Sequence, residues 1–335
     1  MDQAKSLYLA GKSEQAKKVF ESVLPELSKF PASASLGDAQ NGLAQIYTDQ
    51  GAYDLAKRAA SSAVEVFRRI NDPPKEGEAW NNKALAEIQS GDYQAAQQDL
   101  QRALELAHSD PHSSLAVKVL NNLGSAQFFL GKYSEALADY NQALMMVNAN
   151  SQSSWVVYWR QITQFNQATL YQKLGKYESA LQIYLAVRAH SKTLTAGDRA
   201  HLLANLGSLY RRLGDPYKAL DQYRAAQALY LQRHDSDGEI GVLKNVGIVY
   251  GLDLQDLVHA EKLFREGLAL AEKTRNRREA MQSQLYLGEV LLRQGREQAA
   301  AAAFQSALDA ARELQTSEEQ WKALYGLGRI EELRN

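Results

Sequence analysis

The 335-residue chain contains no cysteine, which excludes disulfide bonds, thiolate metal ligands and a cysteine nucleophile. It also lacks any apolar run approaching the roughly 18–20 residues that a membrane-spanning helix needs. Residues 1–15 contain no continuous apolar segment, so they do not resemble a secretory signal peptide. Neither charge sign is in excess, with 38 basic against 39 acidic residues, which argues against a broad nucleic-acid-binding surface. We therefore expect a soluble, cytoplasmic protein that binds neither nucleic acid nor membrane; a secreted protein given without its leader is the alternative.

One spacing recurs along the whole chain: a glycine followed five residues later by an alanine. Seven copies keep both residues, and they begin at Gly11, Gly51, Gly91, Gly131, Gly175, Gly214 and Gly295. Another copy, with Gln255 and Ala260, keeps the spacing but replaces the glycine. Successive copies start 39 to 44 residues apart, which predicts a repeat architecture with about 40 residues per unit.

Each copy has the same local pattern on both sides of the glycine. Before it, as in residues 120–131, leucine, small and aromatic residues recur three or four positions apart, which predicts a helix (the leading helix). The glycine can end that helix because it adopts a left-handed conformation at little cost. A second helix (the trailing helix) follows, and four residues after its alanine most copies carry a large side chain: Phe20, Leu100, Tyr140, Tyr184, Tyr223, Phe264 and Phe304. A small residue three positions later lets the two helices pack closely around the large one.

These residues resemble the tetratricopeptide repeat (TPR) family, whose units are antiparallel helix pairs with W-x-x-L-G-x-x-Y on the first helix and A-x-x-x-F-x-x-A on the second. The resemblance covers essentially the whole chain and is strongest at Leu123-Gly124, Leu206-Gly207 and Tyr210. The period of about 40 residues is longer than the ~34 usual in the family. In that respect the chain is similar to the Pins/LGN adaptors, kinesin light chains, the arrays that precede CHAT-type peptidase domains, and the peptide-sensing Rap/PlcR regulators.

The resemblance implies an all-α, right-handed superhelix (α-solenoid) of eight helix pairs with a C-terminal unpaired or capping helix and no strands. We expect a single solenoid over residues 1–335, with pairs at approximately 1–30, 33–70, 75–109, 113–149, 154–194, 197–234, 237–275 and 277–316. The terminal helix, 317–334, has more apolar residues than one buried stripe needs, among them Trp321, Leu324 and Tyr325. It is either an imperfect cap or the first helix of a ninth pair in a longer natural protein, and it is also a candidate surface for a homodimer.

A column of asparagines marks the leading helices. It lies nine residues before the glycine in four copies and extends to a fifth when one additional residue is allowed: Asn82, Asn122, Asn166, Asn205 and Asn245. Asparagine is a poor helix former, so its recurrence in the middle of helices needs a reason. In a superhelix of this family the leading helices line a concave groove, where these amides can pair with the backbone of an extended peptide. The alternatives are bonding within each repeat and a remnant of shared repeat ancestry; we favour the groove role.

Charged residues indicate which peptide such a groove prefers. In peptide-binding members of the family an asparagine of this column and a lysine one turn earlier hold a terminal carboxylate, and Lys118 and Asn122 match that pair. The chain departs from this clamp at His201 and Asn205, where the resemblance requires basic residues. Other basic residues follow in the central groove: Lys173, Arg211, Arg212 and Lys244. The first groove positions are acidic: Asp38, Asp49 and Glu78. We therefore predict a groove that is basic from the fourth leading helix onward and attracts an acidic segment.

The one irregular join is the 44-residue step, where the next leading helix gains about one turn. Trp155, Trp159 and Phe165 share a face of that helix. They are either an aromatic anchor for a ligand or second subunit, or they pack onto the preceding pair near Met145 and Met146. We favour packing.

Catalytic motifs are lacking. Residues 11–13, Gly-Lys-Ser, resemble the end of a phosphate-binding loop, but Ser6 occupies the position of its first glycine. His108 and His112 fall in a predicted linker, so we expect no zinc site there. We predict a non-enzymatic scaffold, without metal or cofactor, that captures an extended, partly acidic protein or peptide segment in its concave groove. The alternatives are the recognition arm of a larger multidomain protein, such as one with a CHAT-type peptidase domain, and a peptide-sensing regulator of Rap/PlcR type.

Overall fold

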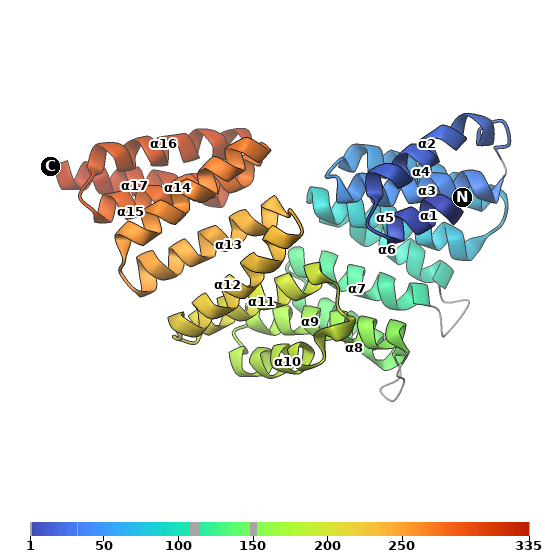
Figure 1. The fold of residues 1–335 in the computed structure, drawn as a ribbon, viewed down its shortest axis with the longest axis horizontal. Coiled ribbons are helices and arrows are strands. Elements are labelled where there is room, and N and C mark those ends of the chain that lie inside the picture. Colours follow the sequence, from blue (N-terminus) through green and yellow to red (C-terminus); the bar gives the residue numbers. More distant parts are fainter. Residues whose placement is uncertain (1, 32, 108–113, 148–152, 335) are drawn as a thin grey trace. The chain divides into compact units, whose positions relative to one another are not determined.

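The computed structural model describes residues 2–31, 33–107, 114–147 and 153–334, and over these residues it contains helices but no strand (Figure 1). The predicted all-α architecture is confirmed, with seventeen α-helices in the described ranges. Their bounds are α1 Asp2–Leu9, α2 Ser13–Leu27, α3 Ala34–Asp49, α4 Tyr53–Arg69, α5 Pro73–Ser90, α6 Tyr93–Ala107, α7 Ser114–Phe129, α8 Tyr133–Met146, α9 Ser154–Lys173, α10 Tyr177–Ala189, α11 Ala196–Arg212, α12 Pro216–Gln232, α13 Ser236–Ile248, α14 Leu257–Thr274, α15 Arg277–Arg293, α16 Glu297–Glu313 and α17 Ser317–Arg334. None of the described helices has the length and apolar character needed to cross a membrane.

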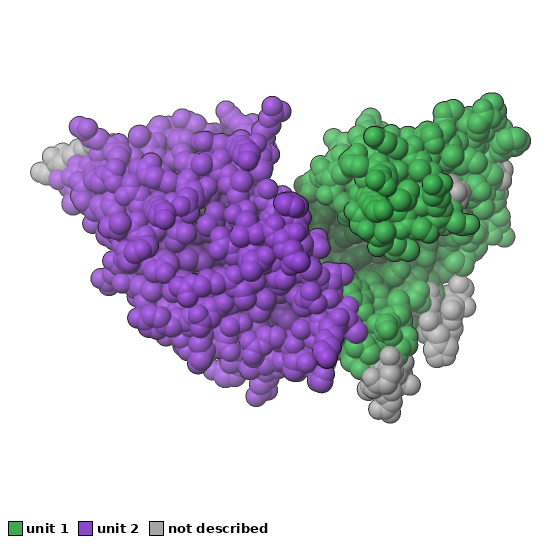
Figure 2. All heavy atoms as spheres, in the orientation of Figure 1, with its two compact units in different colours: residues 1–170 green, residues 171–335 purple. Residues whose placement is uncertain are grey.

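Contacts divide the chain into two compact units, residues 1–170 and 171–335, and the boundary falls inside α9 (Figure 2). From α1 to α8 in the first unit, and from α10 to α17 in the second, each helix contacts the next one along the chain. Leading helices, which carry odd numbers, also contact one another, as α3 does with α5 and α15 with α17. Each unit therefore has one face built by its leading helices, here called the leading face. The expectation of one continuous solenoid over both units stays a prediction.

The turn between the helices of each pair is the one that the repeated glycine predicts. All seven glycines of the spacing have positive φ, from 71° at Gly51 to 87° at Gly91. Gln255, which replaces the glycine in the remaining copy, adopts the same left-handed conformation at φ 57°. A side chain other than glycine is strained there, and the surrounding helices hold it in place.

In four pairs, α7–α8, α11–α12, α13–α14 and α15–α16, the large residue of the trailing helix packs against a glycine of its own leading helix. A Cβ atom added to Gly124 would lie 2.5 Å from the ring of Tyr140, and one added to Gly207 would lie 2.7 Å from Tyr223. Gly247 faces Phe264 and Gly288 faces Phe304 in the same way. These four rings are buried, so each of these pairs is held together by a ring that fills the space left by the missing side chain of a glycine.

The additional residue in the seventh leading helix appears as a π-helical turn. Helix α13 ends at Ile248 and continues into a π-helix over Val249–Asp253 before the turn at Gln255. Such turns absorb single-residue insertions and are frequent at functional sites. This one carries Leu252 and Asp253, both of which take part in the second unit's leading face, as described below.

Candidate functional site

In the first unit the asparagine column forms hydrogen bonds between neighbouring repeats. Each side-chain nitrogen donates to an asparagine oxygen in the preceding repeat: Asn82 to Asn41 (2.8 Å), Asn122 to Asn81 (2.9 Å) and Asn166 to Asn121 (3.3 Å). The sequence did not predict this arrangement, because the two partners of each bond lie 41 to 45 residues apart. These amides therefore link one repeat to the next.

We call these hydrogen bonds between neighbouring repeats the asparagine ladder, and Asn121 is its buried centre. Its nitrogen donates to the Val117 carbonyl and to the Thr163 hydroxyl, both at 2.9 Å, while its oxygen accepts from Asn166. The oxygens of Asn82, Asn122 and Asn166 have no hydrogen-bond partner among the described residues, so they can still accept an N–H from a ligand.

The remaining members of the column lie in the second unit, where both are half-buried: Asn205 on α11 and Asn245 on α13. Groove binding by the whole column stays a proposal.

Two of the predicted basic groove residues already have carboxylate partners. Arg211 donates to Asp253 of the π-turn at 2.7 Å, and Lys244 lies 2.7 Å from Glu279. The positive charge at these positions is therefore largely neutralised.

The other cationic candidates differ in their surroundings. Lys173 and Arg212 are exposed in the second unit and Lys118 is half-buried on α7, and none of the three forms an ion pair within the described ranges. His201 is exposed on α11, with its Nδ1 3.0 Å from the Tyr230 hydroxyl.

At the N-terminal end, the predicted acidic positions form a partly neutralised cluster. Asp38 contacts both Lys5 and Lys75 at 3.1 Å, and the Tyr8 hydroxyl donates to Asp49 at 2.8 Å. Burial raises the pKa of Asp49, and the hydrogen bond from Tyr8 offsets part of that rise. A cavity of about 220 Å³ lies beside this cluster, lined by Asp38 and Glu78 among others.

A buried glutamate of α5, Glu87, lies close to the half-buried Asp99 of α6. Glu87 is almost fully buried, and one of its oxygens has no hydrogen-bond partner. Lys83 contacts Asp99 at 2.6 Å and Glu87 at 3.5 Å, so one lysine serves two carboxylates. Burial, together with the nearby charge of Asp99, raises the pKa of Glu87 to about 7. The folded protein therefore holds a proton on Glu87 that the unfolded chain releases near its ordinary pKa of about 4.5.

We expect the stability of the first unit to fall as pH rises from roughly 5 to roughly 8, because ionising the buried Glu87 has a cost that the unfolded chain does not have. Glu87→Gln should remove this component and stabilise the protein at the higher pH by on the order of 2 kcal/mol. Urea unfolding at both pH values measures the change. Glu65→Gln, at an exposed position of α4, is the control. An equal pH dependence in wild type and Glu87→Gln would contradict the assignment.

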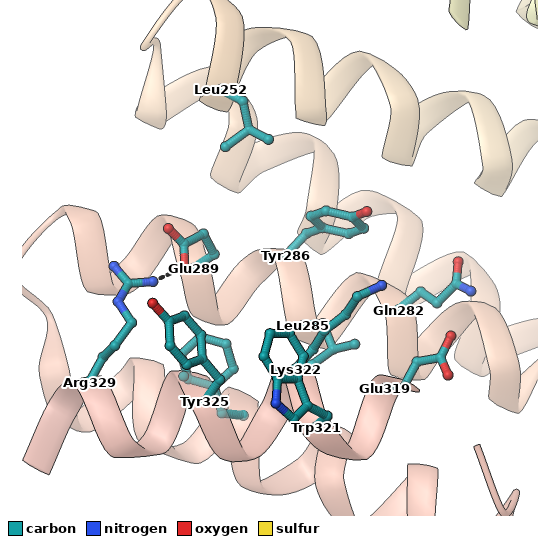
Figure 3. Close-up of a pocket in the computed structure, with 12 residues that line it drawn as sticks. Leu252, Gln282, Leu285, Tyr286, Glu289, Glu319, Trp321, Lys322, Tyr325 and Arg329 are labelled. Carbon is teal, nitrogen blue, oxygen red and sulfur yellow. Dashed lines mark hydrogen bonds and ion pairs between the residues drawn. The ribbon is translucent and has the colours of Figure 1, made fainter. Parts of the chain in front are cut away.

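The second unit has a cavity of about 260 Å³ on its leading face, between α15, α17 and the π-turn (Figure 3). Its walls combine rings with charged groups, and the lining includes Leu252, Leu285, Tyr286, Glu289, Phe304, Glu319, Trp321, Lys322, Tyr325 and Arg329. Leu252 reaches it from the π-turn, on the opposite side from Trp321 and Tyr325 (Figure 3). A concave site with apolar walls and a few polar groups is the usual form of a ligand site.

Two of the charged groups of this cavity pair with each other. Arg329 of α17 donates to Glu289 of α15 at 2.6 Å, as the dashed line in Figure 3 marks. The Trp321 and Tyr325 rings stack with centroids 5.5 Å apart, and Arg329 lies over the Tyr325 ring. Because both rings are mostly exposed, they offer apolar surface to a ligand side chain beside an ion pair that can orient it.

The sequence did not identify this cavity. The surplus of apolar residues on the terminal helix was a valid signal, since Trp321 and Tyr325 both line it. Its other walls come from α15 and from the π-turn, which the repeat pattern alone does not bring together. A search for exposed apolar residues on the last helix would have found Trp321 and Tyr325, but not the residues of α15 and the π-turn that complete the cavity.

The aromatic residues of α9 lie where the packing interpretation expects them. Trp155 and Trp159 pack against a buried cluster that includes Val117, Leu120 and Ala143, with Met146 beside them. Phe165 is half-buried on the same helix. An anchoring role for these three residues stays a prediction.

Potential metal ligands do not gather anywhere in the described ranges: no three histidine or carboxylate side chains lie close enough to hold an ion. His108 and His112 lie outside the described residues.

Two family models described as tetratricopeptide repeat match the chain. One matches residues 34–107, 75–148 and 159–232, and the other matches residues 252–314. No curated protein sequence matches.

Solved structures similar in fold include a Rap protein complexed with competence and sporulation factor. It has a TM-score of 0.66 and 14% identity, and the match covers 99% of this chain and 96% of that one. The APC/C hetero-tetramer Cut9–Hcn1 has a TM-score of 0.66 and 13% identity, covering 98% and 54%. Yeast Tom70 has a TM-score of 0.58 and 18% identity, covering 97% and 60%, so the chain spans only part of these last two proteins. At these identities the structures show the fold alone. Since the family models match more than half of its residues, the chain belongs to the tetratricopeptide repeat family.

Proposed function

We propose that the protein is a non-enzymatic interaction scaffold that binds an extended, partly acidic segment of another protein along its leading helices. The observation that carries this proposal is the cavity between α15, α17 and the π-turn, with stacked rings beside an ion pair. The repeats supply a rigid frame, and the cavity supplies a place for one apolar side chain of the ligand.

The acidic preference rests on two exposed cations that make no ion pair among the described residues. Lys173 and Arg212 are exposed in the second unit and make no ion pair within the described ranges. Arg211 and Lys244 contribute less, because Asp253 and Glu279 already neutralise them. An acidic ligand would therefore bind more weakly as salt screens its attraction to Lys173 and Arg212.

Short peptides selected from a displayed random library against the whole chain test the proposal. We expect Tyr325→Ala to weaken the selected peptides by about tenfold or more, because it removes exposed ring surface from the cavity. Affinity is measured by titration calorimetry. Tyr217→Ala is a matched control, since Tyr217 is an exposed tyrosine on the trailing helix α12. If Tyr325→Ala binds the selected peptides as tightly as wild type does, the cavity is not the binding site. If the selected peptides lack acidic residues, the acidic preference is wrong.

A peptide-sensing regulator is the second candidate. It is favoured by the match to a Rap protein complexed with competence and sporulation factor, which covers nearly the whole of both chains. A sensor must respond to its ligand with a change between states, whereas a passive scaffold need not. Small-angle scattering with and without a selected peptide separates the two, since a sensor should show a change in radius of gyration at saturation.

A further inference from the structure

The cavity of the first unit lies where the asparagine column is interrupted. The position nine residues before the turn glycine is Asn82 in α5 and Asn122 in α7, but in α3 it is Gly42. A Cβ atom added to Gly42 would lie 2.5 Å from the ring of Phe20, so this ring takes the space beside the helix. Both residues line the cavity of about 220 Å³. The cavity therefore lies at a position that later repeats fill with an amide side chain.

Three consecutive leading helices border this cavity. Tyr8 lines it from α1, Asn41 and Gln45 line it from α3, and Glu78 lines it from α5. The ring of Tyr8 adds apolar surface beside the ring of Phe20. Because helices of this chain form its walls on both sides, the cavity is not the uncovered end of a row of repeats.

Three polar side chains of this cavity have unused hydrogen-bonding groups. The exposed Glu78 and the half-buried Gln45 form no side-chain hydrogen bond or ion pair with any described residue. The oxygen of Asn41 accepts from Asn82, but its nitrogen donates to no group in the described ranges. In the same register, the nitrogen of Asn121 has two acceptors. The cavity therefore offers a carboxylate, an amide oxygen and amide N–H groups to a ligand.

The charges of the lining favour a cationic ligand group. One lysine and two carboxylates line the cavity, which gives a net charge of −1: Lys5, Asp38 and Glu78. Asp38 is already shared by Lys5 and Lys75, each 3.1 Å away, and Lys75 also lies over the ring of Phe67. Among the lining residues, Glu78 is therefore the carboxylate whose charge a ligand can balance.

We propose that this cavity binds the side chain of an arginine in a protein ligand. The guanidinium donates to Glu78 and to the oxygen of Gln45, and the methylene groups of the arginine cover the ring of Tyr8. The backbone carbonyl of the same ligand residue accepts from the nitrogen of Asn41. Arginine fits better than lysine, because its planar group has five N–H donors and stacks on aromatic rings. This site lies in the first unit and does not depend on the cavity beside Tyr325.

The probe is arginine blocked at both ends, N-acetyl-arginine N-methylamide, titrated into the full chain. The side-chain amide NMR signals of Asn41 and Gln45 report on the cavity, and we expect them to shift in a saturable way with a millimolar dissociation constant. Glu78→Gln keeps the shape but removes the charge, so it should weaken binding by about fivefold or more. Blocked citrulline, whose neutral urea group has the shape of a guanidinium, should bind the wild-type chain more weakly to the same extent.

Glu65→Gln is the matched control, since Glu65 is an exposed glutamate of the same unit on the trailing helix α4, and it should leave the affinity unchanged. Tyr325→Ala should also leave it unchanged, which separates this site from the second unit's cavity. Circular dichroism checks that the variants fold. No saturation up to the solubility limit of the probe, equal binding of arginine and citrulline, or equal binding to Glu78→Gln and wild type would overturn the proposal. So would a loss of binding in Tyr325→Ala.

Discussion

Replacing Phe304 with alanine should lower the free energy of unfolding by about 3–5 kcal/mol, the usual cost of removing a buried aromatic side chain. Its ring occupies the space beside two glycines, Gly288 of α15 and Gly326 of α17, and so holds three helices together. It also forms part of the wall of the cavity. Urea unfolding measures the loss. Because a solenoid repeat is stabilised mainly by its neighbours, amide exchange should rise first in α15, α16 and α17.

The control for this variant is Phe30→Ala. Phe30 lies largely in solvent after α2, so its truncation should change stability by no more than about 0.5 kcal/mol. Similar losses of unfolding free energy for the two variants would show that the ring of Phe304 does not hold α15, α16 and α17 together as its contacts with the two glycines indicate. Faster exchange spread evenly over α1 to α8 would contradict the local character of the effect.

Replacing Asn121 with alanine should cost about 2–3 kcal/mol, because it removes three hydrogen bonds around one buried side chain. The loss is measured by chemical unfolding. A double-mutant cycle with Asn166→Ala isolates the bond between the two repeats, and we expect a coupling energy of about 0.5–1 kcal/mol.

Asn245→Ala is the control, because Asn245 is a half-buried asparagine of the column whose side chain makes no hydrogen bond in the described part of the chain. Its replacement should leave stability within about 0.5 kcal/mol of wild type. If Asn121→Ala and Asn245→Ala lower the stability equally, the hydrogen bonds of Asn121 do not account for its loss. If neither does, the inter-repeat hydrogen bonds contribute nothing net, and the asparagines are free for the ligand role alone.

The fold could be predicted because its signals are local. The left-handed conformation at Gly51 or Gly91 follows from the residue itself, and Gln255 keeps it because the repeat on each side imposes the turn. The large residue four positions after each alanine predicted the packing of Tyr140 and Phe304, although it did not show that a glycine would lie beneath each ring.

The candidate site was harder to predict because it depends on contacts between repeats. Asn122 was placed on the right helix, but its bond to Asn81 requires knowing how far one repeat turns relative to the next. Arg211 was predicted to add positive charge to the groove, but Asp253 of the π-turn neutralises it. The cavity needs Leu252, Tyr286 and Tyr325 from three elements, and no single period of the sequence aligns them.

The π-helical turn at Val249–Asp253 also bears on how such arrays vary in length. An inserted residue rotates everything after it by about 100° around the helix axis, which would turn a buried stripe toward solvent. Here the wider turn takes up that rotation within five residues, and Phe264 still reaches Gly247 in the same pair. A helical-repeat protein can thus gain one residue in a single unit, place a new side chain such as Leu252 in the wall of a cavity, and keep the helix packing of that unit.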